Sequence, residues 1–310
     1  MDALIVNLNL AIDKTTKIPA LKPNRIYRFA SAHTQPGGKG VNVARVLKEL
    51  GCKPVIAGFV SGHSGRWIEE TLARERFDRI LVRHSSGESR TCYSIVDAAG
   101  VSTDFSEEGP AVPAPAQKLL LKKLSAHARN FRMAAVCGRM SMGLGKDFYG
   151  RMTRLLKKAG CFTAYDTSGE PLMEGLLAGA DMVKINGAEF AEIAGEGASR
   201  GAVKRFFRKY SPRGLKALIV TEGPRPTLAI SQFGFWEILP VPLGRIASPV
   251  GAGDSFMGGF ICGFMKGLGF EENLRLASGC SASDCLTLGA GRISGREAEA
   301  FARKIRVRKI

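Results

Sequence analysis

The sequence of 310 residues lacks any uninterrupted apolar run approaching the roughly 20 residues that a membrane-spanning helix needs. Its first ten residues, MDALIVNLNL, have an acidic residue at position 2 and lack the basic start of a secretory signal peptide. We therefore expect this segment to be a first core strand, and the protein to be cytoplasmic with no membrane partner.

Patterns that bind metals or form disulfide frameworks are also lacking. The seven cysteines are odd in number and scattered without a CxxC pair, and the four histidines show no paired spacing. Most cysteines stand in apolar contexts such as AAVCG and GFICGF, which is typical of buried, reduced thiols. A zinc site is therefore not expected.

Acidic residues are in the minority, 28 against 45 basic ones, so the net charge is +17. Such an excess of positive charge is typical of proteins that bind nucleic acid, acidic lipid or phosphorylated small molecules. No basic stretch is interleaved with aromatic residues, which makes nucleic acid an unlikely partner. The basic cluster at the end, ARKIRVRKI, is interpreted as a solvated helix face.

Short apolar runs alternate along the chain with longer helical patterns. The expected buried strands are 4–9, 55–60, 134–138, 162–167, 181–186 and 217–223. The expected helices are 41–50, 64–76, 116–129, 146–159, 199–210, 254–268 and 271–287. Alternation of this kind predicts an α/β fold with a doubly wound, mostly parallel sheet between helix layers.

Two segments break this rhythm. Residues 14–35 alternate polar and apolar side chains, and residues 89–105 resemble a hairpin that turns near 97–100. We expect the two lid segments, 14–35 and 89–105, to form a small accessory β-sheet over one domain that spans 1–310. An exposed sheet face favours pairing with a second subunit, so we also expect a homodimer through the lid.

The first glycine-rich turn, PGGKGVNVARVLKELG, precedes a helix that we expect to begin near Gly40. Gly37 and Gly38 can adopt positive φ and expose backbone N–H groups, and Lys39 adds a positive charge at a helix N-terminus. Taken alone, this pattern is equally typical of a plain connection between a strand and a helix.

The second turn, SPVGAGDSFMGGF, lacks the lysine that ends a P-loop. Gly251 and Gly253 free backbone N–H groups that can stabilise charge on a transferred phosphoryl group. Asp254, at or near the N-cap, has two interpretations: a helix cap worth about 1 kcal/mol, or a general base that takes a proton from an attacking hydroxyl. The missing lysine excludes the P-loop class and leaves phosphoryl transfer open.

Together the two turns resemble the two signatures of the PfkB family of sugar kinases, which has the ribokinase-like fold. Further segments, NLNLAIDKT, SRTCYSIVD, YDTSGEPL and KINGAEF, resemble its hexose-phosphate branch, the 1-phosphofructokinases and tagatose-6-phosphate kinases. The resemblance runs from about residue 5 to residue 292. It implies Mg2+-dependent transfer of a phosphoryl group from ATP to a sugar phosphate, with fructose 1-phosphate first and tagatose 6-phosphate second.

The resemblance also implies roles for individual residues. Asp254 corresponds to the catalytic base, and the anion hole corresponds to Gly251, Ala252 and Gly253. The sugar-binding set corresponds to Asp13, Gly37, Gly38, Lys39 and Asn42, and the arginine that holds the substrate's phosphate to Arg90. The nucleotide and magnesium segments correspond to Lys184, Asn186, Glu189, Thr221 and Gly223. Without the resemblance, Asn186 and Glu189 would be interpreted as a turn followed by a helix start.

Several positions depart from the family pattern. Leu10 replaces a proline, Pro226 stands where glycine is common, and Ser248 stands where Asn or Asp is usual. Arg139 lies in the segment that usually reads GSLP, where it can add a phosphate contact or narrow the sugar pocket. These departures leave two alternatives open: a kinase of an unphosphorylated sugar or nucleoside, and a non-catalytic protein that binds sugar phosphates or nucleic acid.

Overall fold

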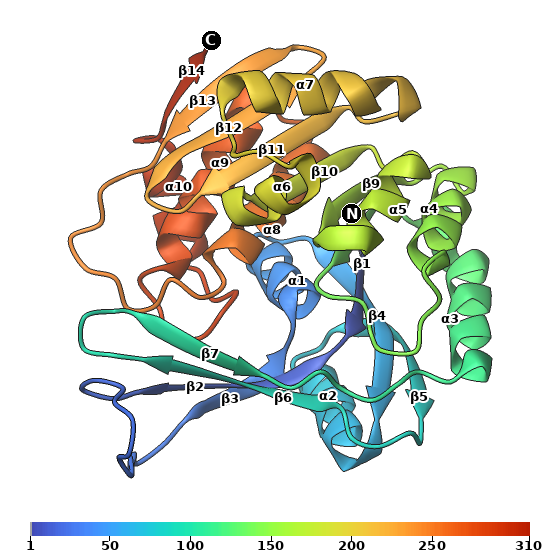
Figure 1. The fold of residues 1–310 in the computed structure, drawn as a ribbon, viewed down its shortest axis with the longest axis vertical. Helices are drawn as coiled ribbons and strands as arrows, with labels where there is room; N and C mark the ends of the chain where they lie inside the picture. The colour runs from blue at the N-terminus through green and yellow to red at the C-terminus, as the bar shows by residue number, and fades with distance from the viewer. Residues whose placement is uncertain (1) are drawn as a thin grey trace.

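The computed structural model describes residues 2–310, which form two sheets and their covering helices (Figure 1). The strands are β1 Asp2–Asn9, β2 Ala11–Lys17, β3 His33–Gly37, β4 Lys53–Ser61, β5 Asp78–His84, β6 Arg90–Val96, β7 Ser102–Ser106, β8 Met133–Cys137, β9 Phe162–Asp166, β10 Met182–Asn186, β11 Ala217–Glu222, β12 Arg225–Ser231, β13 Gly234–Leu239 and β14 Arg306–Lys309. The α-helices are α1 Lys39–Glu49, α2 Gly62–Arg74, α3 Ala114–His127, α4 Phe148–Lys158, α5 Gly169–Leu177, α6 Gly187–Ala194, α7 Arg200–Tyr210, α8 Ala252–Met265, α9 Phe270–Asp284 and α10 Gly295–Ala302, with 3-10 turns at Ala128–Asn130 and Ser211–Arg213.

The central sheet has ten strands in the order β14-β13-β12-β11-β10-β9-β8-β1-β4-β5. All pairs from β5 to β11 are parallel, whereas β12, β13 and β14 continue the sheet antiparallel. The six strands expected from the sequence are confirmed, and β5, β12, β13 and β14 are additional. The doubly wound, mostly parallel sheet is confirmed.

Strand β1 explains why the sheet needs helices on both faces. Its side chains alternate between two cores: Leu4 and Val6 pack with residues of α3 to α7, and Ala3 and Ile5 pack with residues of α1, α2, α8 and α9. All four are fully buried. A strand apolar on both faces is typical of a parallel sheet between two helix layers, and Figure 1 shows these layers.

The expected helices are present, with ends that differ by up to three residues, and α5, α6 and α10 were not expected. One interpretation is wrong: the basic cluster at the end of the chain is not a helix face, because α10 ends at Ala302 and Arg306–Lys309 pairs with β13 as edge strand β14. Lysine and arginine on an exposed edge strand discourage pairing with another sheet. Among residues 2–310, no helix is both long and apolar enough to cross a membrane.

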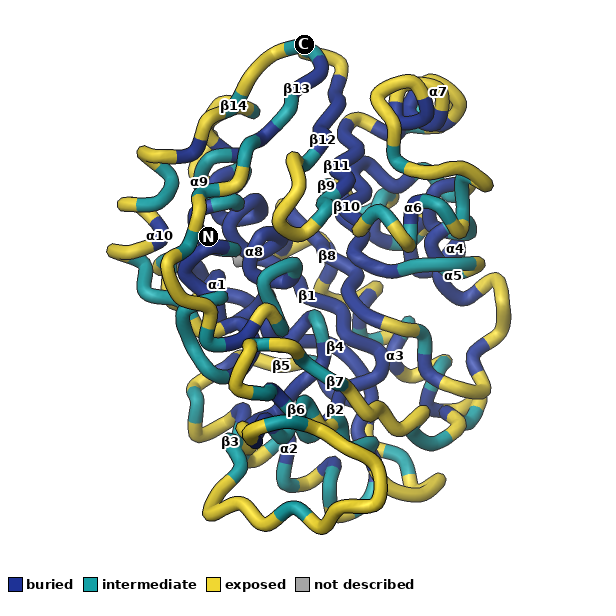
Figure 2. The backbone as a smooth tube through the Cα atoms, turned by 60° about the vertical axis from the view of Figure 1, so that its left-hand side comes forward, coloured by how far each residue is buried: buried dark blue, intermediate teal, exposed yellow. Residues whose placement is uncertain are grey.

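The accessory sheet has four strands in the order β3-β2-β6-β7. Strands β2 and β6 are parallel, and the other two pairs are antiparallel. The expected hairpin turn is confirmed, since Gly100 N donates to Asp97 O at 3.0 Å and Gly100 has φ 81°. Residues 18–32 contain no strand, so only the ends of the first segment join the sheet. Figure 2 shows that the accessory sheet and its loops are far more exposed than the central strands.

Candidate active site

The candidate site lies at the carboxyl ends of the parallel strands. Asn9, Asp166 and Asn186 are the last residues of β1, β9 and β10. Strand order reverses next to β1, which has β4 on one side and β8 on the other. In open α/β sheets, ligands bind outside the carboxyl ends of the strands at such a switch point.

The first glycine-rich turn packs against two polar side chains. A Cβ atom on Gly37 would collide with the Asp13 carboxylate, so only glycine fits there. Gly38, with φ 98°, precedes α1, and its N–H donates to Asp13 Oδ2 at 3.3 Å. Positive φ was expected at both glycines, but only Gly38 adopts it. Burial raises the pKa of Asp13, although the Gly38 N–H and the charges of Arg45 and Arg90 oppose this.

Asn7 also holds this turn and was missed at the sequence level. Its Oδ1 accepts a hydrogen bond from Gly40 N at 2.7 Å, and a Cβ atom on Gly38 would lie 2.7 Å from the same oxygen. Asn7 is 1% exposed. The signal was present in the sequence, because a lone asparagine inside the apolar run LIVNLN needs a hydrogen-bonding partner.

The second turn leads into α8 and brings Asp254 to α1. Gly251, with φ 96°, is the N-cap of α8, and Asp254 lies in the first helical turn. The interpretation of Asp254 as a helix cap is wrong, since α8 has no side-chain cap hydrogen bond. Instead, Asn42 Nδ2 donates to Asp254 Oδ2 at 2.8 Å. Asp254 is only 7% exposed, and its carboxylate is oriented by the hydrogen bond from Asn42 of α1.

Two lysines meet at Asp166, which the sequence analysis did not single out. Lys39 Nζ lies 2.9 Å from Asp166 Oδ1, and Lys184 Nζ lies 2.8 Å from Asp166 Oδ2. Asp166 and Lys184 are buried. A Cβ atom on Gly253 would lie 2.8 Å from Lys184 Nζ, so this lysine packs against the glycine turn. Asp166 therefore holds two positive charges beside the turn that was expected to bind phosphoryl oxygens.

The pKa values in this cluster follow from burial and neighbouring charges. Burial and the Asp166 carboxylate raise the pKa of Asp254 to about 7, although Lys39, Lys184 and Asn42 lower it. Burial would raise the pKa of Asp166, but Lys184 and Lys39 hold it below its usual value. Burial would lower the pKa of Lys39, yet the carboxylates around it raise it. Asp254 can therefore exchange a proton near neutral pH.

Asn186 and Glu189 form a capping box at the start of α6. Asn186 Oδ1 accepts from Glu189 N, and Glu189 Oε2 accepts from Asn186 N, both at 2.9 Å. Glu189 Oε1 also lies 3.2 Å from Lys39 Nζ. The interpretation as a helix start is thus confirmed. Among residues 2–310, no group of three His, Cys, Asp or Glu side chains could hold a metal by itself.

Thr221 and Gly223 lie on the same edge of the sheet. Thr221 is in register with Asn186 on the neighbouring strand, and its Oγ1 donates to Ile185 O at 3.4 Å. Gly223, with φ 59°, lies in the turn between β11 and β12. The expected nucleotide loop is therefore a hairpin turn beside the end of β10.

The two arginines expected at the sugar end have different surroundings. Arg90 begins β6, and its Nε and Nη1 donate to Asn9 O and Glu107 O, each at 3.3 Å. It lies on the neighbouring strand to Asp13, whose pKa it lowers. Arg139 has a side chain that is 68% exposed and lies 3.5 Å from Glu108. Arg90 is thus held by the backbone, whereas Arg139 pairs with an exposed carboxylate near solvent.

Comparison with protein families identifies the chain. The model of the pfkB family carbohydrate kinases matches residues 5–294. The chain belongs to this family. The PfkB chain is accordingly a carbohydrate kinase, a phosphotransferase with an alcohol group as acceptor.

Curated relatives of this PfkB chain are similar over nearly their whole length. It is 25% identical to a tagatose-6-phosphate kinase of Staphylococcus epidermidis, over 98% of each chain. It is 27% identical to a 1-phosphofructokinase of Haemophilus influenzae, over 89% of this chain and 88% of that one. It is 29% identical to a 1-phosphofructokinase of Rhodobacter capsulatus, over 98% and 97%.

Solved structures share the fold. A possible 1-phosphofructokinase of Thermotoga maritima superposes with a TM-score of 0.87 at 20% identity, covering 100% of both chains. The phosphofructokinase-2 of Escherichia coli in complex with fructose-6-phosphate superposes with a TM-score of 0.84 at 21% identity, covering 98% of both. A ribokinase of Giardia lamblia, with a TM-score of 0.80 at 17% identity over 96% and 99%, confirms the ribokinase-like fold.

Proposed function

We propose that the protein transfers the γ-phosphoryl group of ATP to a hydroxyl of a phosphorylated ketohexose. The substrate that we favour is fructose 1-phosphate, which gives fructose 1,6-bisphosphate. Tagatose 6-phosphate is second. The names of the curated relatives support a sugar phosphate as acceptor. The family supports a nucleoside triphosphate as donor.

The observation that carries the proposal is the environment of Asp254. The carboxylate is buried at the start of α8, fixed by Asn42, and has a pKa raised to about 7. A general base works best when its pKa lies near the operating pH. Asp254 takes the proton of the attacking sugar hydroxyl as the bond between oxygen and phosphorus forms. The bond to the ADP leaving group then breaks.

The turn before Asp254 receives the developing phosphoryl charge. Backbone N–H groups of Gly251, Ala252 and Gly253 at a helix N-terminus form an anion hole. Lys184, packed against Gly253, adds a positive charge that Asp166 holds in place. The Ala252 N–H donates to Pro249 O at 3.4 Å, and it would exchange this long hydrogen bond for one to the phosphoryl group.

Magnesium fits this site as a partner of the nucleotide. Mg2+ prefers oxygen ligands and keeps several waters when it binds phosphates. Asn186 and Glu189 offer such oxygens, but their capping box and Lys39 already use them. They would therefore hold the ion through its waters. The ion would neutralise charge on the ATP phosphates.

The sugar lies between the first glycine turn and the accessory sheet. Asp13, Gly37, Gly38, Lys39 and Asn42 surround this end of the site. Arg90, on the strand beside Asp13, holds the substrate's phosphate. A guanidinium binds phosphate through two parallel hydrogen bonds, and its anchoring by backbone carbonyls fixes its direction.

A coupled assay of ATP consumption over sugars and sugar monophosphates tests the proposal. We expect turnover with fructose 1-phosphate and weaker turnover with tagatose 6-phosphate. Turnover only with an unphosphorylated sugar or nucleoside would contradict the role of Arg90. No turnover, together with a salt-sensitive shift of random DNA, would favour the non-catalytic alternative.

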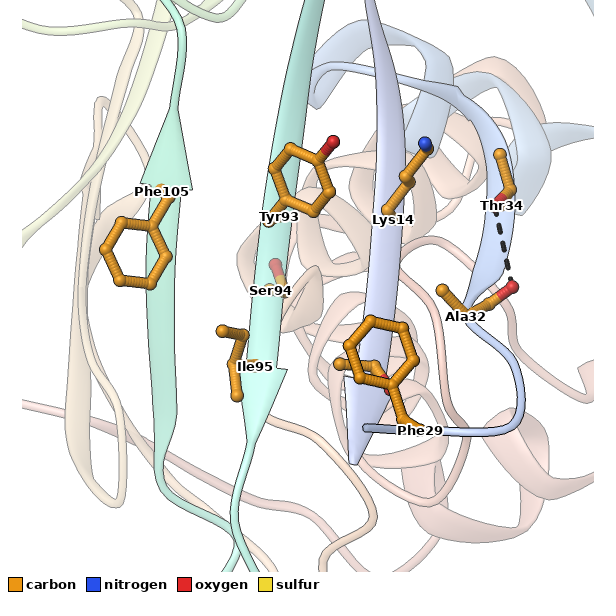
Figure 3. A pocket seen from close by; sticks show the side chains of 9 residues that line it. Lys14, Phe29, Ala32, Thr34, Tyr93, Ser94, Ile95 and Phe105 are labelled. Atoms are coloured by element: carbon orange, nitrogen blue, oxygen red, sulfur yellow. Dashed lines mark hydrogen bonds between the residues drawn. The ribbon is translucent and has the colours of Figure 1, made fainter. Parts of the chain in front are cut away.

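We propose a further role for the face of the accessory sheet that points away from Asp13. There Lys14, Phe29, Tyr93 and Phe105 line a hollow of about 450 Å³, shown in Figure 3. Phe29, Tyr93 and Phe105 are 49%, 42% and 53% exposed. Because Lys14 is the one charged residue among those that line the hollow, we propose that its partner is a second copy, which presents the same largely apolar face across a twofold axis. The protein is then a homodimer of single kinase domains joined through their lids.

A further inference from the structure

The loop that follows α9 packs directly against the turn of the anion hole. A Cβ atom on Gly251 would lie 2.5 Å from Ala290 Cβ and 2.8 Å from Asp284 Oδ2. Asp284, which is 1% exposed, accepts a hydrogen bond from Arg292 N at 2.9 Å through its other oxygen. Thr287 Oγ1 donates to Arg292 O at 2.7 Å and so closes the loop. The position of Ala290 therefore limits where Gly251 can lie.

The same loop is held from its other side by Gln35, in strand β3 of the accessory sheet. Gln35 Nε2 donates to Ala290 O at 3.0 Å, and Arg292 Nε donates to Gln35 Oε1 at 2.8 Å. Gln35 is 2% exposed. Arginine N–H groups can only donate, so Oε1 must face Arg292 and Nε2 must face Ala290. Gln35 Oε1 also accepts a hydrogen bond from Nε2 of His33, on the same strand, at 3.0 Å. Both ends of the amide therefore contact the loop, and the oxygen is shared with His33.

Gln35 also belongs to the sugar end of the site. It is directly opposite Asp13 in the pairing of β2 with β3 and lies two residues before Gly37. One buried side chain therefore connects the strand pair that carries Asp13 to the loop that packs on Gly251. Phosphoryl transfer is catalysed mainly by positioning and charge stabilisation, and a misplacement of about 1 Å can lower the rate roughly 10²-fold.

We propose that Gln35 is a positioning residue, which sets the distance between the bound sugar and the anion hole by holding Ala290 against Gly251. This inference rests on the proposed kinase function. Gln35 itself would contact neither the sugar nor the nucleotide. Loss of its amide should therefore affect the chemical step more than the binding of either substrate.

The variant Gln35→Leu keeps a side chain of similar size and removes both hydrogen bonds to the loop, together with the one to His33. We expect kcat to fall roughly tenfold to hundredfold, while KM for the sugar phosphate and for ATP changes by less than about threefold. A second readout compares the affinities of ADP alone and ADP with aluminium fluoride, which mimics the transferred group. The ratio of these affinities should fall with kcat. A purely structural role would lower the melting temperature and leave this ratio unchanged.

Arg292→Met is a safer second variant, because residue 292 is exposed and only its contact with Gln35 Oε1 is lost. We expect a smaller fall in kcat than for Gln35→Leu, with a correspondingly smaller fall in the ratio of affinities. Arg296→Met, at an exposed arginine of α10, is the matched control and should behave as wild type. If Gln35→Leu does not fold, Arg292→Met decides the question alone.

Three results would overturn the inference: an unchanged kcat in a folded Gln35→Leu enzyme, a rise only in KM for the sugar, or equal effects of Arg292→Met and Arg296→Met. The inference fails separately from the proposed function. Absence of ATP consumption by the wild-type enzyme with every sugar phosphate would contradict the function before any variant is made.

Discussion

At the proposed phosphoryl end of the site, Asp166, Lys184 and Asp254 are buried and held by short hydrogen bonds that join α1, α8 and two strands, β9 and β10. At the sugar end, Arg90 is half-buried on the accessory sheet and Arg139 is largely exposed. The charges at the phosphoryl end are therefore largely shielded from solvent and interact strongly with one another. The sugar end depends on side chains near solvent, whose charges are screened.

This difference suggests which part of the enzyme sets the chemistry and which sets the substrate. Every PfkB kinase must stabilise the same phosphoryl group, which suits a buried, braced cluster. The acceptor differs between relatives named for tagatose 6-phosphate and fructose 1-phosphate. We expect variants at the phosphoryl end to change kcat, and variants at the sugar end to change KM for the sugar.

The largest effect is expected from Asp254→Asn, which keeps the size of the side chain and removes the base. The value of kcat should fall by roughly 10²–10⁴, the usual contribution of general base catalysis. Stability should not fall. Because burial raises the pKa of Asp254 above its unfolded value, the folded state binds a proton more tightly, and ionisation at pH 8 weakens folding. The melting temperature at pH 8 should therefore stay equal or rise.

The control for this variant is Asp147→Asn. Asp147 is an exposed carboxylate just before α4. It should leave both kcat and the melting temperature near wild type. An Asp254→Asn enzyme with kcat within about threefold of wild type would contradict the role of Asp254 as the base.

The next effect tests the sugar end by comparing its two arginines. Arg90→Lys loses the paired hydrogen bonds of a guanidinium, and a charge-assisted bond contributes about 1.5–3 kcal/mol. We expect KM for the sugar phosphate to rise roughly tenfold to hundredfold, while KM for ATP hardly changes. Arg139→Lys should change either KM by less than about threefold, since its side chain is 68% exposed. If steady-state kinetics show that both substitutions raise KM for the sugar phosphate equally, the proposal that Arg90 rather than Arg139 holds the substrate's phosphate is contradicted.

A smaller effect concerns pH. The general base acts only when ionised, so kcat/KM should rise with pH through a midpoint near 7, the raised pKa of Asp254. Asp166→Asn removes a negative neighbour and leaves Lys39 and Lys184 to stabilise the Asp254 carboxylate. The midpoint should therefore move down by about one unit. A pH profile of kcat/KM measures this shift.

Asp181→Asn is the matched control for this shift. Asp181 is equally buried and lies within 2.9 Å of two lysine side chains, Lys157 and Lys216, but it precedes β10 at the opposite edge of the sheet. Asp166→Asn should lose more stability, because it leaves the buried ammonium group of Lys184 with one partner fewer, whereas Lys157 and Lys216 beside Asp181 are partly exposed. Only Asp166→Asn should move the midpoint. A shift in both, or in neither, would show that Asp166 does not set the pKa of Asp254.

Much of the fold could be predicted because the central strands are buried on both faces. Such strands are continuous apolar runs, as in VIAGFV and ALIVTEG. Strand β5, DRILVRH, was missed because it is an edge strand with three charged residues. The hairpin of β12 and β13 was missed because these two antiparallel strands follow one another with no helix between them, whereas the expected strands alternate with helices.

The two glycine turns of the candidate site were predictable, because each is a local pattern directly before a helix. Asp166 was missed because its role depends on Lys39 and Lys184, which are 127 and 18 residues away in the chain. Gln35 likewise acquires its partners only through the fold, since Ala290 and Arg292 are 255 and 257 residues away. A polar residue in a strand can signal that it needs a partner, as Asn7 does, but it does not indicate which distant residue that partner is.

The smallest effect on activity is expected at the outer face of the accessory sheet, where we propose that two copies meet. Phe105→Glu would place a charge in the hollow lined by Phe29 and Tyr93 and would make each copy repel the other. Sedimentation should show a dimer for wild type at micromolar concentration and a dissociation constant at least roughly tenfold higher for the variant.

Phe233→Glu is the matched control, because Phe233 is 66% exposed in the turn between β12 and β13. It should leave the dimer intact, and both variants should keep kcat within about threefold, since Phe105 pairs with Tyr93 on the face away from Asp13. A wild-type monomer would contradict the dimer, and dissociation by both substitutions would show that the hollow does not mark the interface.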